Sequence, residues 1–297
     1  MSALNYATQY SKALAEAYPY TLYFGRLWSN ENASKYKVVD ANTIKIPTLT
    51  TTGRVNGNRD SIGSFARNFD NDWETKTLKQ HRCWNTLVHP RDVDETNQVV
   101  SIMNITKVFN EEQKFPEMDA YTISQLYSLK AALESITQET ADLTTQNVLT
   151  KFDALMDKMD EARVPSAGRI LYVDTYTKTL IDNAIALTRS TGQKAIVRDT
   201  SRLEEVEIVS VPTTMMKTKY TFETGWAVAD DAKDVAMMLV HPSCIIPAVN
   251  YEFAQLEPPS ALSQGKYVYY EESFEDIFLL NKRHAAIQFV VKKDVGV

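Results

Sequence analysis

The chain has 297 residues, of which 44% are hydrophobic and 24% charged, so it can bury a substantial core and is neither largely disordered nor collagen-like. Lys and Arg number 32 against 38 Asp and Glu, and this net charge of -6 disfavours a protein that grips nucleic acid through phosphate contacts. No apolar run approaches the roughly 20 residues that cross a bilayer, and the N-terminal residues lack the pattern of a secretory signal.

The segment up to Tyr36 is rich in aromatic side chains and shows little sustained periodicity. Residues 3–17 are predicted as a helix, and the rest is predicted as an extended arm. Leaving so much aromatic surface in water would cost roughly 25 cal/mol for each apolar Å². We therefore expect the arm to pack on its own domain or on a neighbouring copy.

Residues 38–93 favour strands. Apolar and polar residues alternate in an outgoing run over residues 38–50 and again in a return run from Trp73 to Val88. The segment between them contains an Asn-Gly pair, which is favoured where both central residues of a turn need positive φ. The sequence therefore predicts one long two-stranded hairpin with a polar tip. Because isolated hairpins are only marginally stable, something must hold it in place.

Helices are expected in the middle of the chain. The first is predicted to open at Asp94-Glu95-Thr96, because acidic and capping residues favour the N-terminal end of a helix. Pro116 is expected to end that helix and to begin the next one. A third, amphipathic helix runs from Val148 to Met159 and ends before Val164-Pro165.

The remaining elements mix strands with one further helix. Residues 168–174 are predicted as a short buried strand, and Asp174 or Thr175 caps the helix that follows. Later strands are expected at Val206–Val211, at Ala236–Ile246 with an interruption at His241-Pro242, and at Lys266–Lys293. Helices and strands do not alternate strictly, so the predicted fold class is α+β.

No residue pattern is typical of a catalytic, cofactor or metal site. The two cysteines are far apart, which fits a reducing compartment, and the glycines form neither a phosphate loop nor a nucleophile elbow. The histidines lack metal-ligand spacing and are interpreted as structural or surface residues: His81, His89, His241 and His284. The acidic groups are interpreted as solvated: Asp70, Asp72, Asp230, Asp231 and Asp234. An aromatic arm and a long hairpin instead indicate a self-assembling structural protein, because extended elements regain little burial alone.

Four segments and their order carry a resemblance to a known family. They are DANTIKIPTLTTTGRVNGNRDSIGSF, HPRDVDETNQVVSIMNITKVFNEEQKFPEMDAY, ARVPSAGRILYVDTYTKTLID and EDIFLLNKRHAAIQF, with VSVPTTMM and MMLVHPSCIIP before the last. In this order the chain resembles the major capsid proteins of tailed bacteriophages with the Hong Kong phage type of fold, close to versions common in prophages of Gram-positive bacteria.

The resemblance implies a division into an N-terminal arm (1–37), an extended loop (38–93), a peripheral domain with a spine helix (94–145 and 264–297) and an axial domain (146–263). It also implies hexamers and pentamers that form an icosahedral shell around double-stranded DNA, without sequence-specific binding. Assembly in the bacterial host cytoplasm, with portal and scaffolding proteins as further partners, is implied as well. No enzyme activity, cofactor, metal or membrane is expected.

The tip of the extended loop is the expected site of contacts between subunits. By the resemblance, its contact residues are Arg54, Asn56, Gly57, Arg59 and Asp60. Some family members cross-link covalently through a loop-tip lysine, but the tip here carries arginines, which stay protonated. The nearest lysines are Lys45 and Lys76, so no cross-link from the tip is expected.

Two other functions remain open at this point. The first is an encapsulin-type nanocompartment shell with the same fold, which would differ in nucleic acid content and particle diameter. The second, from a different class, is a soluble enzyme that uses His241 or the cluster around Asp230. Such an enzyme would elute from a sizing column as a small oligomer.

Overall fold

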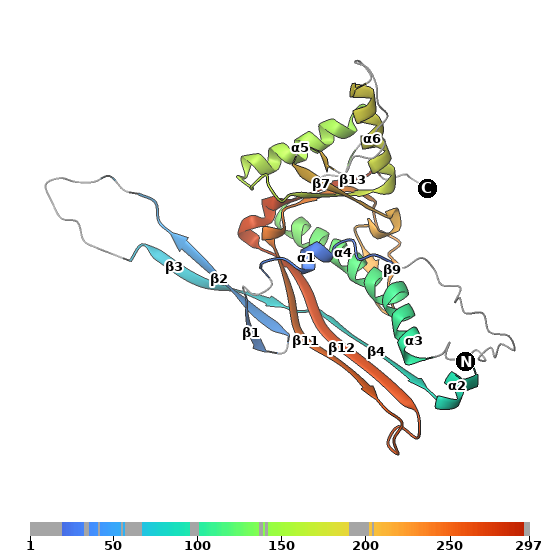
Figure 1. Cartoon of the computed structure of the whole chain (residues 1–297). Helices are drawn as coiled ribbons and strands as arrows, with labels where there is room; N and C mark the ends of the chain where they lie inside the picture. Colours follow the sequence, from blue (N-terminus) through green and yellow to red (C-terminus); the bar gives the residue numbers. More distant parts are fainter. Residues whose placement is uncertain are drawn as a thin grey trace.

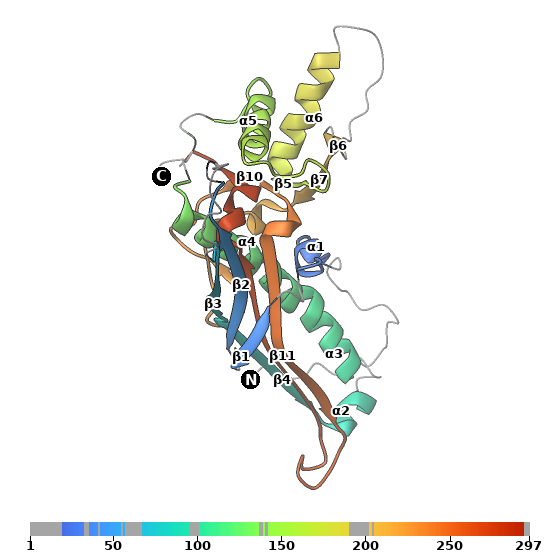
Figure 2. The ribbon, with the colours of Figure 1, turned by 90° about the vertical axis from the view of Figure 1, so that its left-hand side faces the viewer.

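The computed structural model describes residues 20–32, 36–40, 42–54, 56, 67–95, 101–136, 139, 142–189, 202–203 and 205–293. The helix predicted over residues 3–17 lies outside these ranges. The described chain forms a layered body, a hairpin that projects from one side of it, and a long sheet that extends downwards (Figures 1 and 2). Of the helices described, none is long and apolar enough to cross a membrane.

A five-stranded mixed sheet forms the upper part of the body, with strands in the order β13-β10-β5-β7-β6. β5 and β7 run parallel, and the other neighbouring pairs are antiparallel. The strands are β5 (Ile170–Asp174), β6 (Arg202–Leu203), β7 (Val206–Val211), β10 (Val235–Val240) and β13 (Ile287–Val291). The buried strand predicted at residues 168–174 and the strand at Val206–Val211 are confirmed.

Helices cover both faces of this sheet (Figure 2), which explains why β5 and β10 are buried throughout. Leu171 packs with α5 (Val148–Glu161) and α6 (Thr175–Arg189), whereas the next residue, Tyr172, packs with α4 (Phe115–Leu133) and α1 (Gly25–Trp28). The predicted amphipathic third helix is therefore confirmed. Asp174 Oδ1 accepts a hydrogen bond from Thr177 N at 3.2 Å, so Asp174 caps α6 as expected.

A long helical run descends from the body. It consists of α3 (Ile102–Phe109), a π-helical turn η1 (Asn110–Lys114) and α4 (Phe115–Leu133). The expected break at Pro116 is wrong, since Pro116 lies in the first turn of α4 and helical backbone continues on both sides. The wide π turn before it removes the need for an N–H donor there and leaves room for the proline ring.

The helix start predicted at Asp94-Glu95-Thr96 is also wrong. Glu95 instead ends the short helix α2 (Pro90–Glu95), and Ser101 caps α3 by accepting a hydrogen bond from Asn104 N at 3.3 Å. Serine is among the strongest N-cap residues, so it outweighs the acidic residues upstream as a start signal.

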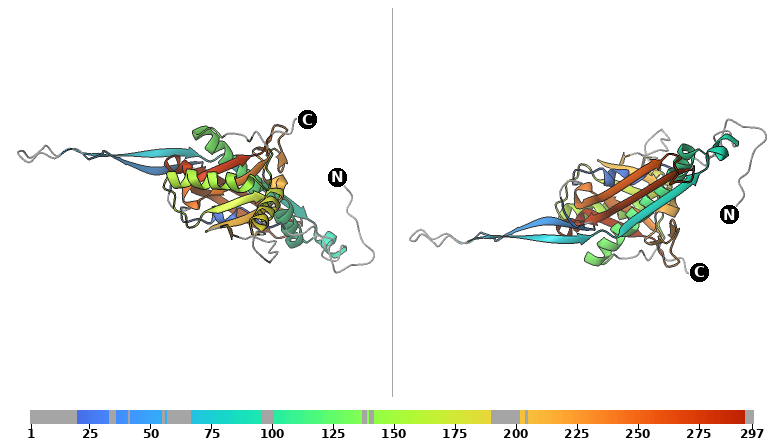
Figure 3. Two further views of the ribbon diagram at one scale, coloured as in Figure 1. Left: turned by 90° about the horizontal axis from the view of Figure 1, so that it is seen from above. Right: turned by 90° about the horizontal axis from the view of Figure 1, so that it is seen from below.

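A second, antiparallel sheet lies beside this helical run. Its strands are β11 (Ile245–Glu257), β12 (Tyr267–Leu279) and β4 (Gln80–Val88), side by side when the molecule is seen from below (Figure 3). The last strand was predicted to continue over Lys266–Lys293, but a 3-10 helix, η4 (Asn281–Ala286), separates β12 from β13. The chain thereby passes from the long sheet into the five-stranded sheet.

The hairpin belongs to a third sheet, with β1 (Lys37–Asp40), β2 (Thr43–Thr51) and β3 (Phe69–Thr77) in that order. The prediction of a single return strand from Trp73 to Val88 is wrong in its second half, because Gln80–Val88 forms β4 and pairs with β12. The buried Leu78 marks the change of sheet. Short elements complete the fold: η2 (Thr213–Met215), β8 (Tyr220–Thr221), β9 (Ala227–Val228) and η3 (Pro242–Cys244).

Candidate functional site

The hairpin formed by β2 and β3 projects from the body, and most residues of its distal part are exposed (Figure 1). Its register pairs Pro47 with Trp73 and Thr51 with Phe69, so these residues share one face with Leu49. Leu49, Phe69 and Trp73 are 63%, 54% and 45% exposed. The hairpin therefore presents an apolar stripe to solvent, and we call Leu49, Phe69 and Trp73 the hairpin stripe.

The root of the hairpin, by contrast, is fixed on the body. Ile44 and Ile46 point to the opposite face and are buried in a small core with Leu78, Ile246 and Phe278. These contacts hold only the proximal part of the ribbon.

Polar contacts reinforce the same root. Lys282 donates to Leu49 O at 3.0 Å, and Lys76 donates to Asn281 Oδ1 at 3.3 Å. Lys76 also forms an ion pair with Glu74 at 2.6 Å. The hairpin is thus tied to η4 by side chains of both partners, and its projecting direction is set by the body.

Asp276, a fully buried carboxylate on β12, ties the hairpin root to the helical run. It accepts hydrogen bonds from Lys79 N and from Tyr121 Oη, both at 2.9 Å. Burial raises the pKa of Asp276, and these donors oppose the shift. Because Lys79 separates β3 from β4, Asp276 fixes the point where the chain leaves the hairpin for the long sheet.

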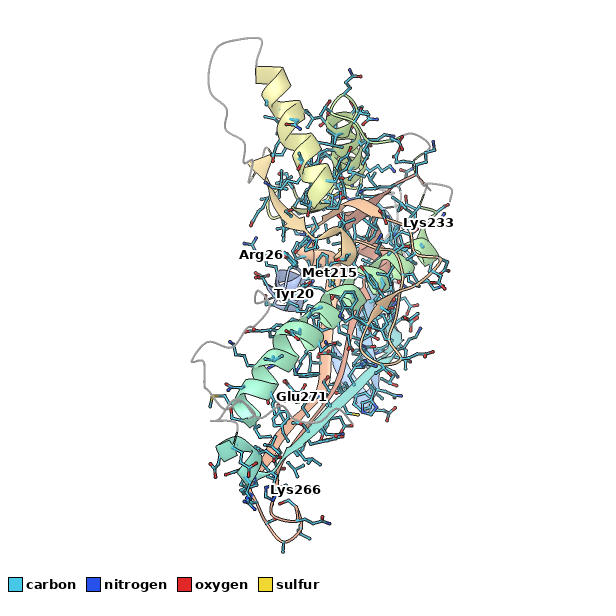
Figure 4. The ribbon with its side chains drawn as sticks, turned by 90° about the vertical axis from the view of Figure 1, so that its right-hand side faces the viewer. Tyr20, Arg26, Met215, Lys233, Lys266 and Glu271 are labelled. Carbon is cyan, nitrogen blue, oxygen red and sulfur yellow. The ribbon has the colours of Figure 1, made fainter. Side chains whose placement is uncertain are left out.

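A second buried carboxylate, Asp119 on α4, holds the described part of the N-terminal segment. It accepts hydrogen bonds from Tyr20 Oη at 2.8 Å, from Tyr23 N at 2.9 Å and from Phe24 N at 3.1 Å. Figure 4 shows Tyr20 beside this helix. Burial raises the pKa of Asp119 to about 6. The arm was expected to pack either on its own domain or on a neighbouring copy, and residues 20–32 pack on their own subunit.

The long sheet has one face against the helical run and one facing away. Trp84 stacks on Phe109 with ring centroids 3.9 Å apart, and Lys114 pairs with Glu271 at 3.2 Å. On the other face, Tyr251 and Phe253 are 46% and 37% exposed. This face is another candidate contact surface.

A cavity of about 640 Å³ opens between the long sheet and the helical run. Its charged groups are largely paired with one another, as in the contact between Arg82 and Glu117 at 2.5 Å. Burial raises the pKa of Glu275 in its wall to about 7. In the part of the chain that the structure describes, no group of three or more His, Cys, Asp or Glu side chains could hold a metal ion.

The residues that an enzyme would have used do not converge. His241 is held by Ser243 Oγ at 2.8 Å and by Ala167 O at 3.1 Å, and burial lowers its pKa, so it is a neutral structural group. Asp231 pairs with Lys219 at 2.6 Å, and Asp234 pairs with Lys217. Asp230 is exposed. The enzyme alternative therefore gains no support from these residues.

The expected tip residues are only partly described. Arg54 and Asn56 lie beyond the end of β2 and are exposed, whereas Gly57, Arg59 and Asp60 lie outside the described residues. Sequence reasoning missed Asp119 and Asp276. Asp276 directly precedes the apolar residues Ile277, Phe278, Leu279 and Leu280, and that signal could have marked it as a buried anchor.

Solved structures of phage capsids are similar to this chain in fold. The mature capsid of bacteriophage PhiM1 matches with a TM-score of 0.72 and 13% identity, over 98% of this chain and 93% of that chain. The capsid of Cyanophage P-SCSP1u matches with a TM-score of 0.66 and 11% identity, over 97% and 93%. A structure from Mycobacterium phage Che8 matches with a TM-score of 0.63 and 12% identity, over 100% of both chains.

By sequence, no family model and no curated protein matches. The likeness is one of fold over nearly the whole chain. The chain has the α+β fold of phage capsid proteins of the Hong Kong phage type, as the sequence resemblance implied.

Proposed function

From this capsid fold, we propose that the chain is a major capsid protein that self-assembles through its hairpin. Copies would form hexamers and pentamers of an icosahedral shell around double-stranded DNA, and the hairpin of each copy would lie on an adjacent one. The observation that carries this proposal is the hairpin stripe, which leaves Leu49, Phe69 and Trp73 in solvent on a ribbon that projects from the body.

The physical argument is that the hairpin carries apolar side chains that its own subunit does not bury. A two-stranded ribbon is marginally stable alone, and fully burying a large apolar side chain is worth roughly 1.5–3 kcal/mol. The distal part of the hairpin obtains little of this burial within its own subunit. An adjacent copy would supply it, and the buried anchors Asp119 and Asp276 would keep the body rigid while the hairpin reaches out.

The proposed role is structural and not catalytic. The acidic net charge of -6 suits a wall that confines DNA without adhering to it. Portal and scaffolding proteins would be the other partners, in a shell assembled in the host cytoplasm, and the division into arm, extended loop, peripheral domain and axial domain belongs to this proposal. So do the kinship with prophages of Gram-positive hosts and the absence of a cross-link from the tip.

The loop-tip contacts are proposed on the same basis. Arg54 and Asn56 are exposed at the described end of β2, where charged and amide groups suit contacts with a neighbour. Gly57, Arg59 and Asp60 complete the proposed tip by their place in the sequence.

Sizing chromatography and electron microscopy of the purified chain, with and without a candidate scaffolding protein, test the proposal. We expect capsomers or closed shells, and particles from the host should protect double-stranded DNA from nuclease. A chain that stays monomeric at every concentration under both conditions would contradict assembly. Shells of uniform small diameter that hold a protein cargo would support the nanocompartment instead.

A further inference from the structure

A second cavity, of about 360 Å³, lies where α5 ends and η3 and η4 begin, away from the cavity beside the long sheet. Three cationic side chains line it: Arg163, Lys282 and Arg283. Among the described residues, no carboxylate lines it, in a chain where acidic residues outnumber basic ones 38 to 32. We call Arg163, Lys282, Arg283 and the space between them the basic pocket.

The three cations are not neutralised by the described part of their own chain. Lys282 donates to Leu49 O at 3.0 Å and Arg283 donates to Ser243 O at 3.0 Å, and both acceptors are neutral carbonyls. Among the described residues, neither of these side chains nor Arg163 forms an ion pair with an Asp or Glu. Like charges held together raise each other's free energy, so an anion between them would be bound favourably.

The described walls of the basic pocket are held by hydrogen bonds and carry no negative charge. The buried Arg169 pairs with Asp160 at 2.5 Å and donates to Pro165 O at 2.9 Å, so the Asp160 carboxylate is already engaged. His241 is held by Ser243 and Ala167, and burial lowers its pKa, so it forms a neutral wall. The position therefore suits an oxyanion bound by guanidinium and ammonium groups.

We propose that the basic pocket receives a carboxylate side chain from an adjacent copy of this chain. This inference rests on the proposed function and identifies a second point of contact between subunits. It is favoured because Lys282 connects the basic pocket to the hairpin at Leu49, a residue of the hairpin stripe, so the pocket is continuous with the proposed interface. A DNA backbone is a poorer fit, since phosphate binding along a duplex uses a long stripe of basic residues rather than one compact cluster of three.

Isotope-mixed coupling tests this inference. Shells assembled from an equal mixture of ¹⁴N- and ¹⁵N-labelled chains are treated with a carbodiimide, which joins a lysine amine to a carboxylate with loss of water. We expect mass spectrometry to find Lys282 linked to an Asp or Glu peptide of the other isotope. Lys282→Arg keeps the charge but removes the amine, so its shells should form and lack this link.

Charge removal gives a second readout. The double variant Arg163→Gln/Arg283→Gln should raise the concentration needed for assembly about tenfold, since removing the charged partners of a carboxylate weakens an interface. Arg91→Gln is the matched control, because Arg91 is an exposed arginine on α2 outside the basic pocket, and it should leave assembly unchanged. Circular dichroism and melting curves establish that the variants fold.

The outcomes separate the two proposals. A wild-type chain that forms no capsomers or shells contradicts the proposed function itself. Normal shells in which Lys282 links only within one isotope, or not at all, contradict the basic pocket as a contact between copies and leave the capsid role standing. Variants that assemble normally but retain less nuclease-protected DNA would assign the pocket to phosphate and overturn the inference.

Discussion

The five-stranded sheet and the hairpin are built from the same kind of backbone but meet opposite surroundings. Every residue of β10 is buried between helices on two faces, whereas most residues of β3 are exposed. The apolar side chains of β10 complete a core within one subunit. Those of the hairpin stripe have no such core, although the register aligns them on one face.

The difference teaches where the stability of each region comes from. The central sheet needs nothing beyond its own chain, so its sequence should govern whether the monomer folds. The distal hairpin adds little to monomer stability and should govern whether copies associate. Substitutions in the two regions should therefore separate folding from assembly.

The largest expected effect is a loss of monomer stability from a cavity in the central sheet. Leu239→Ala removes a fully buried side chain from β10 and should lower the free energy of unfolding by about 2–5 kcal/mol. Leu49→Ala, on the hairpin, is the matched control and should change it by less than about 0.5 kcal/mol. Urea denaturation of the unassembled chain measures both free energies of unfolding. Equal losses in the two variants would show that the hairpin and the central sheet contribute alike to monomer stability.

The second largest effect is expected on assembly rather than on monomer stability, and it comes from the hairpin. Trp73→Ser should leave the unfolding of the monomer nearly unchanged and raise the concentration needed for assembly roughly 30-fold, which corresponds to about 2 kcal/mol of lost burial. Met103→Ser supplies the control, since Met103 is 80% exposed on α3 and lies off the hairpin. Light scattering against concentration gives the readout. If Trp73→Ser does not change the concentration needed for assembly, the hairpin stripe is not part of the interface.

A smaller effect should appear where the two regions join. Tyr121→Phe deletes the hydrogen bond to the carboxylate of Asp276 and should cost about 1.5 kcal/mol. Because Asp276 also holds Lys79 N, amide exchange should accelerate at the hairpin root more than in β10. On the same helix, Tyr127→Phe is the control, since Tyr127 makes no side-chain hydrogen bond to any described residue. Uniform acceleration across both sheets would show that Asp276 does not act locally.

The sequence predicted best those elements whose signals are local. The apolar run of β5, the capping Asp174 and the amphipathic α5 all came from short-range patterns that the body preserves. The α+β class and the capsid resemblance were also correct. Alternation in the hairpin correctly indicated its exposed ribbon.

The wrong predictions concern elements whose structure is determined by contacts with residues far away in the sequence. The sequence between β3 and β4 contains no turn signal, and the buried Leu78 and the carboxylate of Asp276 divide the predicted return strand between two sheets. Likewise, Pro116 predicts a break by itself, but the π turn before it keeps the helix continuous. The anchors Asp119 and Asp276 were missed because Tyr20 and Tyr121, which donate to them, lie about 100 or more residues away along the chain.

The smallest effect concerns Asp119 and the dependence of stability on pH. The pKa of Asp119 is raised to about 6 in the folded chain, above its ordinary value of 3.8, so the folded state binds this proton more tightly than the unfolded state. Its contribution therefore favours folding increasingly as pH falls through 6, and is worth about 1 kcal/mol between pH 7 and pH 5. Asp119→Asn removes the titration, so the stability of the wild type relative to this variant should rise by that amount over this interval.

Urea denaturation at each pH gives the difference, and a constant difference would mean that the carboxylate titrates near its ordinary pKa. Since Asp119 holds residues 20–24 to α4 and has no contact with the hairpin stripe, its titration should leave the effect of Trp73→Ser on assembly unchanged.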